Sequence, residues 1–148
     1  MDIPPEVTIK STIKPGSVYY FPNEVLSSKE SHYFIVINID PIEDEVIFLV
    51  CSSSKIDKVK QRNRHNPPQT LVAISKEDYE DFTCDSIINC NNVFSERIEG
   101  LVDKLSKKTL KLKAEMNKNI VKKLREATWA SLQVTLDIKK KLGMKISD

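Results

Sequence analysis

Five short runs rich in β-branched and aromatic residues, separated by turn-forming residues, constrain the fold of this chain most strongly. Short strands at such spacing are typical of a small antiparallel barrel or sandwich. Between the second and third runs, Pro41 cannot join a ladder and the acidic residues around it keep a hairpin loop in water. The predicted strands cover residues 16–21, 33–39, 45–53, 70–75 and 86–94.

The chain changes character after Gly100. Residues 101–142 contain neither Gly nor Pro, and their apolar residues recur at nearly the helical period. We therefore expect two C-terminal α-helices, with Ser106 as the N-cap of the first and a weak point at 117–119. The apolar positions that define the two stripes are Leu101, Leu105, Leu112 and Met116, then Ile120, Leu124, Ala127, Ser131, Val134 and Ile138.

These patterns predict an α+β protein, mainly β, with two parts. Residues 1–100 are expected to form the barrel, including a short helix near 76–82 that Ser75 as N-cap and Asp78 predict. Residues 101–148 are expected to form a basic helical segment. The simplest interpretation is that these amphipathic helices cover the barrel; the alternative is that they pack on a dimer partner or bind nucleic acid.

Size and composition narrow the class of protein. A chain of 148 residues with 40% hydrophobic and 30% charged residues suits one core. No run approaches the roughly 18 apolar residues of a membrane span, and the first residues lack signal-peptide features, so we expect a soluble cytoplasmic protein with no membrane partner. Three cysteines without CxxC spacing, Cys51, Cys84 and Cys90, indicate reduced, mostly buried thiols and neither a metal site nor a cofactor.

Charge is distributed unevenly along the sequence. Residues 1–100 carry 10 Lys and Arg against 16 Asp and Glu, whereas residues 101–148 carry 13 against 5. Within the acidic part, the segment 55–65 holds five cations against Asp57 and is predicted to be a basic loop directly after the third strand. Such a local positive surface suggests an anionic partner.

Three phrases resemble the MazF/PemK family of type II toxin-antitoxin ribonucleases. KPGSVYYF at 14–21 is similar to the family's first strand, of the type GDIYYVDL, and EVIFLVCSS at 45–53 is similar to its central strand, which ends in a hydroxyl pair. DSIINCNNVFS at 85–95, followed by GLVDKLS at 100–106, resembles the stretch SVVLCDQIRT … IGKLS before the family's final helix. The resemblance covers residues 14 to about 118.

This resemblance implies an SH3-like barrel that forms a homodimer, cleaves single-stranded RNA without a metal and is inhibited by a cognate antitoxin protein. The family opens its second strand with a catalytic arginine, whose position His32 takes here. The family's catalytic threonine falls on Ser52 or Ser53, and Val93-Phe94-Ser95 stands where the family has an arginine-threonine pair, so a basic contact is missing there. The segments that indicate the fold are therefore more similar to the family than the residues at its catalytic positions.

The remaining residues contain the groups that RNA cleavage by internal 2′-OH attack needs. His32 is a suitable general acid or base near neutral pH, and Ser52 and Ser53 offer hydroxyl donors to a phosphate oxygen. A half-exposed packing histidine and turn-forming serines are the structural alternatives. The predicted RNA-binding residues are Lys55, Lys58, Lys60, Arg62, Arg64 and His65.

Two other functions stay open. The lost arginines suggest a catalytically degenerate toxin fold that binds nucleic acid or a protein partner without cleaving it. The basic helices expected within 106–142 suggest a protein-interaction domain that docks an acidic partner.

Overall fold

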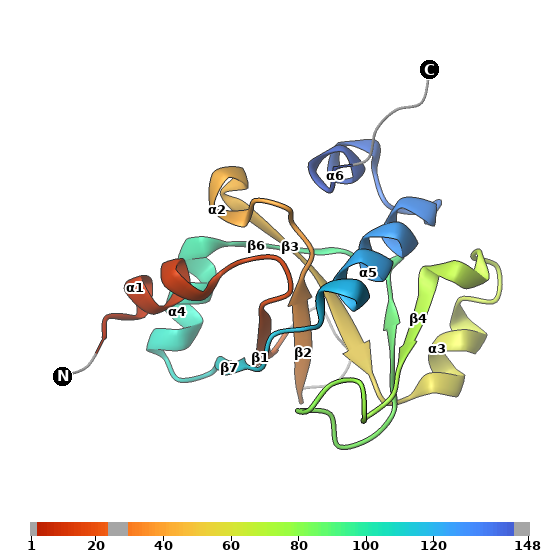
Figure 1. Cartoon of the computed structure of the whole chain (residues 1–148), viewed down its shortest axis with the longest axis horizontal. Helices are drawn as coiled ribbons and strands as arrows, with labels where there is room; N and C mark the ends of the chain where they lie inside the picture. The colour runs from red at the N-terminus through yellow and green to blue at the C-terminus, as the bar shows by residue number, and fades with distance from the viewer. Residues whose placement is uncertain (1–2, 24–29, 144–148) are drawn as a thin grey trace.

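A seven-stranded antiparallel sheet organises the computed structural model, which describes residues 3–23 and 30–143 (Figure 1). The strand order is β4-β5-β3-β2-β1-β7, and β6 also pairs with β3. The strands are β1 (Val18–Pro22), β2 (Ser31–Val36), β3 (Val46–Ser53), β4 (Leu71–Ile74), β5 (Ser86–Asn89), β6 (Phe94–Arg97) and β7 (Lys111–Lys113). The expected α+β class and the antiparallel pairing are confirmed, but the described strands do not close into a barrel.

Six α-helices and one 3₁₀ turn surround the sheet in the described ranges. In Figure 1, α1 and α4 lie together at one side, α5 crosses the front of the strands and α3 stands beside β4. The helices are α1 (Pro5–Thr12), α2 (Pro41–Asp44), α3 (Ile56–Arg62), α4 (Ile98–Ser106), α5 (Lys118–Ala130) and α6 (Leu136–Lys141), with η1 (Pro68–Thr70) before β4.

The long strand β3 connects the two parts of the sheet. Along one edge, its first half pairs with β6 from Val46↔Arg97 to Leu49↔Phe94, and its end pairs with β5 at Ser52↔Ile88. Along the other edge it pairs with β2, at Phe34↔Cys51 among others. Two consecutive strands, β5 and β6, therefore share one edge of β3, which accounts for the single long run predicted at 86–94.

Both faces of the central strands are buried, so alternate residues enter different cores. Phe48 and Val50 belong to the core that α5 covers, together with Val121 and Leu124. Ile47 and Leu49, one position away, belong to a second core with residues of α1 and α4 such as Ile9 and Leu101. A strand buried on both faces carries a continuous apolar run, as residues 46–51 do.

The segment predicted as a helix near 76–82 forms turns instead, and the prediction was wrong. The Ser75 hydroxyl donates to the Asp78 carboxylate at 3.0 Å, so the serine does not cap a helix. The Asp81 carboxylate accepts a hydrogen bond from the Ala114 N–H at 2.7 Å, and the Tyr79 hydroxyl donates to the Ala114 carbonyl. Both side chains thus form hydrogen bonds with the backbone of Ala114, just after β7, and must point in the same direction. Residues two positions apart in a helix do not face the same direction.

The C-terminal part also differs from the prediction. Ser106 ends helix α4 rather than starting a helix, and the residues after it form a turn and β7, which pairs with β1. Leu112 therefore lies on a strand, where it is 38% exposed. The second expected helix is two helices, because the chain is extended at Ser131 between α5 and α6.

Helix α5 is attached to the sheet by Arg125. Its guanidinium donates to the carbonyls of Ile37 and Asn38, at 2.8 and 3.0 Å, just past the end of β2. Burial lowers the pKa of this guanidinium, which nevertheless stays charged. Helix α5 thus packs on the sheet of its own chain, as in the first of the two arrangements considered for the C-terminal segment.

We expect Arg125→Ala to lower the free energy of unfolding by about 2 kcal/mol, because two charge-assisted hydrogen bonds are lost. Urea denaturation measures this difference. Lys122→Ala, an exposed change on the same helix, should stay within about 0.5 kcal/mol of the wild type. Equal stability of Arg125→Ala and Lys122→Ala would show that the contact contributes nothing.

Candidate functional site

His32 and Ser53 lie on the same face of the sheet. His32 alternates with Phe34 and Val36 on β2, and Ser53 alternates with Leu49 and Cys51 on β3. The reference residues Phe34, Val36 and Leu49 all belong to the core beneath α1 and α4. Because β2 and β3 are neighbouring antiparallel strands, the start of β2 and the end of β3 come together at one end of the sheet.

Ser52 points to the opposite face. It pairs with Ile88, which belongs to the core beneath α5, and only 5% of its surface is exposed. A phosphate that contacts His32 therefore cannot reach the Ser52 hydroxyl. Of the two serines that the sequence left open, Ser53 is the one placed with His32.

The environment of His32 favours the neutral imidazole. Burial lowers its pKa below 6.5; the carboxylate of Glu30 opposes this shift, and the positive charge of Lys55 adds a smaller lowering. Its Nε2 atom is buried and has no hydrogen-bond partner among the residues that the structure describes. A neutral imidazole can accept a proton at neutral pH, but only at a ring nitrogen that the substrate reaches, so the buried Nε2 leaves Nδ1 for this role.

Ser53 is oriented by the backbone that follows it. Its hydroxyl oxygen accepts a hydrogen bond from the Lys55 N–H at 3.1 Å, and the side chain is half-buried. A hydroxyl that accepts one bond can still donate its proton to another acceptor. Ser53 can therefore offer a donor to a phosphate oxygen beside His32.

The basic segment 55–65 is mainly the helix α3, so its prediction as a loop was wrong. Ile56, Val59 and Asn63 are half-buried at helical spacing, and the helix has Asp57 in its first turn and Lys60 in its last turn, as the helix dipole favours. The density of charge hid this amphipathic pattern. All six predicted RNA-binding side chains are exposed, namely Lys55, Lys58, Lys60, Arg62, Arg64 and His65.

Lys104 is a cation near this site that the sequence did not reveal. Its ammonium lies 5.6 Å from the ring centroid of Phe21, which is the β1 partner of His32, and 3.4 Å from Glu96. Lys104 comes from α4, far away in the sequence. Its placement depends on the packing of that helix against the sheet, and no local pattern predicts it.

The cysteines do not supply a nucleophile at this site. Burial raises the pKa of Cys51, on the His32 face, to about 12, and it does the same for Cys90. Both thiols are therefore protonated near neutral pH. Cys84 is exposed, contrary to the expectation of mostly buried thiols, and within residues 3–23 and 30–143 no group of His, Cys, Asp and Glu could hold a metal ion.

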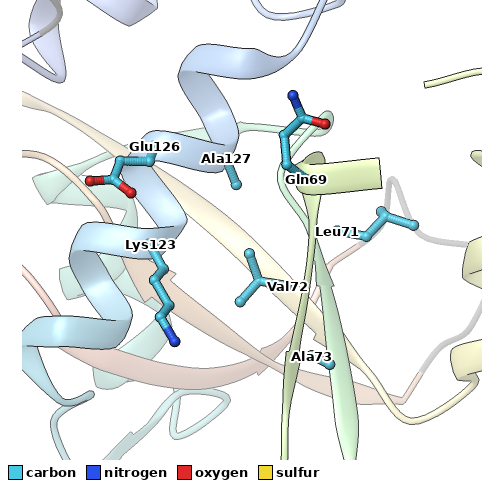
Figure 2. Close-up of a pocket in the computed structure, with 7 residues that line it drawn as sticks. All are labelled: Gln69, Leu71, Val72, Ala73, Lys123, Glu126 and Ala127. Carbon is cyan, nitrogen blue, oxygen red and sulfur yellow. The ribbon is translucent and has the colours of Figure 1, made fainter. Parts of the chain in front are cut away.

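Two cavities of the described structure lie away from His32 and Ser53. One of about 480 Å³ lies between β4 and α5, and one of about 450 Å³ lies between the β5–β6 turn and the start of α6. Figure 2 shows Val72 and Ala127 pointing into the gap between β4 and α5. Neither cavity is lined by His32 or Ser53.

A scan against models of protein families finds none that matches, and a search of curated proteins finds no match either. In the described part of the chain, no helix is both long and apolar enough to cross a bilayer.

We expect NMR titration to give His32 a pKa below 6.5, because burial disfavours the imidazolium. The resonance is assigned by its loss in His32→Gln. The unfolded chain then binds more protons than the folded one just below pH 6.5, so folding stability should fall as the pH drops through this range. A His32 pKa above 6.5 would contradict the buried, Lys55-facing environment.

Proposed function

We propose that this protein is a metal-independent endoribonuclease of the MazF/PemK type that cleaves single-stranded RNA. The observation that carries the proposal is the placement of His32 and Ser53 on one face, beside Lys55 and the exposed cations of α3. A proton acceptor, a hydroxyl donor and a positive charge are the groups that internal cleavage needs.

In the proposed reaction, neutral His32 takes the proton of the ribose 2′-OH. The 2′ oxygen forms a bond to phosphorus, the bond from phosphorus to the 5′ oxygen breaks, and that leaving oxygen takes a proton from water. The products are a 2′,3′-cyclic phosphate and a 5′-OH end. Ser53 donates to a non-bridging phosphate oxygen, and Lys55 stabilises the charge that develops there.

The strand arrangement is compatible with an SH3-like barrel that is open on one side. Among the described strands, β4, β6 and β7 each have one unpaired edge, and the turn segment carrying Tyr79 and Asp81 spans from the end of β4 to Ala114. The homodimer, the cognate antitoxin and a cytoplasmic location belong to the same proposal. An adjacent gene for a small protein with an acidic C-terminal tail would support it.

We expect the purified protein to cleave single-stranded RNA in EDTA, and both His32→Gln and Ser53→Ala to reduce the rate more than tenfold, because general acid–base catalysis and phosphate contacts each contribute factors of this order. A gel assay of a labelled oligonucleotide measures the rate. End-group analysis should find the cyclic phosphate.

Ser52→Ala is the matched control, since Ser52 points to the other core. Its rate should stay within about twofold of the wild type, and all three variants should keep the wild-type melting temperature within a few degrees. Absence of cleavage by the folded wild type would rule out the proposed ribonuclease activity. Equal rates in His32→Gln and the wild type would remove His32 from the mechanism but leave the class open.

The β4 edge favours a second candidate function, a module that binds an extended peptide without cleaving RNA. Among the described strands, β4 pairs with β5 alone, and no lysine or proline interrupts its sequence Leu-Val-Ala-Ile. The cavity of about 480 Å³ lies beside this edge, with α5 as its other wall. A peptide added to an edge strand and lying against a helix is a common recognition mode.

The described residues of α5 carry Lys118, Lys122, Lys123 and Arg125 against Glu126, so an acidic peptide fits this groove. An alternating aspartate–valine heptapeptide, followed by fluorescence anisotropy, is the probe. Lys123→Glu, which changes the cavity wall, should weaken binding more than tenfold, whereas Lys122→Glu should change it less than threefold, because charge pairs count mainly at short range. Equal weakening by both would indicate unspecific charge attraction.

A further inference from the structure

Lys108 occupies a backbone position that usually belongs to glycine. Its φ is 61°, in the left-handed region that L-residues disfavour. The Thr109 N–H donates to the Lys104 carbonyl and the Lys108 N–H to the Leu105 carbonyl, both at 3.0 Å. This pair of bonds is the Schellman motif, in which glycine is the common residue at the position that Lys108 takes.

The turn that carries Lys108 is held rigidly. The Lys104 carbonyl accepts from the N–H and the hydroxyl of Thr109, both at 3.0 Å, and from the N–H of Leu110 at 3.3 Å. Leu110 is only 3% exposed and belongs to the core beneath α1 and α4. The cations of the turn are therefore presented in a fixed position, with little backbone entropy left to lose on binding.

This turn lies at the same end of the sheet as the candidate site. His32 pairs with Phe21, and continuing the β1–β7 register by one residue beyond Lys111↔Tyr20 places Leu110 on the other side of Phe21. Two strand spacings, about 10 Å, separate His32 from Leu110. In this row, Lys55 follows Ser53 at one end, and Lys108 precedes Leu110 at the other.

The charges of the turn are only partly paired. Residues 103–113 contain five lysines against Asp103. Lys107 pairs with Asp103 at 3.0 Å, and Lys104 pairs with Glu96. In the described part of the chain, Lys108 and Lys111 form no ion pair.

Protection of the β7 edge explains only some of these lysines. Lys111 and Lys113 lie on the strand, where charged side chains discourage pairing with other chains. Lys108 precedes the strand and has an unfavourable backbone conformation that glycine would relieve. Backbone strain of this kind is often retained where the side chain has a function.

We propose that the α4–β7 turn, with Lys108 at its centre and Lys107 and Lys111 beside it, is a second phosphate-binding segment for single-stranded RNA. The inference rests on the proposed function and extends its binding surface. RNA lies across the row from α3 to the turn, so that phosphates on both sides of the nucleotide at His32 are held. Binding at both sides of the scissile bond fixes its position beside the imidazole.

The test uses a fluorescent 12-residue 2′-O-methyl RNA, which lacks the attacking hydroxyl and reports binding without cleavage. Lys108→Gly should have an unchanged or higher melting temperature but a lower affinity, and its plot of log K against log salt should be flatter by about 0.7 for one lost contact with a single strand. Lys108→Arg should retain the affinity, because arginine also binds phosphate.

Glu45→Gly is the matched control. Glu45, with φ 63°, is the other non-glycine residue at positive φ in the described chain, and it lies before β3, at the opposite end of that strand from Ser53. The Glu45→Gly variant should relieve backbone strain as Lys108→Gly does, but it should leave the affinity for RNA unchanged. Suppose that Lys108→Gly matches the wild type in affinity and salt slope, while Lys58→Gln and Arg62→Gln weaken binding. This result would overturn the role of the turn and leave the ribonuclease proposal standing. Absence of binding by the wild type would overturn both.

Discussion

The double burial of β1, β2 and β3 is the constraint on which the rest of this structure depends. Each strand must supply two sets of apolar side chains, one for the core beneath α5 and one for the core beneath α1 and α4. Phe21 stacks on Phe34 with ring centroids 4.3 Å apart in the second core, directly beside His32 and Lys104. Because burying a large side chain stabilises the fold by about 1.5–3 kcal/mol, the register is fixed strongly, and with it the face that His32 and Ser53 share.

Polar contacts take over where the strands stop pairing. The free carbonyl and N–H of Ala114, just after β7, are satisfied by Tyr79 and Asp81, and the Tyr33 hydroxyl donates to the Asp81 carbonyl at 3.0 Å. Burial raises the pKa of Tyr79, so its hydroxyl remains a donor over the physiological range. Side chains, and not a further strand, thus connect the segment after β4 to the end of β7. In the same way, Arg125 donates a hydrogen bond to the carbonyl just past the end of β2.

The strands were predictable from sequence because β-branched runs and turn residues act locally, and all five predicted runs contain observed strands. The failures have a common cause in tertiary pairing. Leu112 fits a helical stripe, yet three residues of β7 gain a partner in β1, and Ser75 fits a capping box, yet Asp81 is needed at Ala114. For the site, the family resemblance brought His32 and the serines together. Alternation along a strand sends Ser52 and Ser53 to opposite faces, but only the ladder Ser52↔Ile88 shows which of them faces His32. Lys104 and the α3 helix required the packing of distant elements, which no single motif encodes.

Three departures from local rules lie at the same end of the sheet. His32 has a buried nitrogen without a described partner, Lys108 has a left-handed backbone where glycine is usual, and α3 concentrates cations on a body that is otherwise acidic in its first hundred residues. Each feature is unfavourable for folding by itself, through lost hydrogen bonding, backbone strain or charge repulsion. A stability argument gives no reason for these three costs to lie at the same end of the sheet. Binding of a polyanion gives one for the cations and the turn, because it neutralises the positive charges and uses the fixed geometry of the turn.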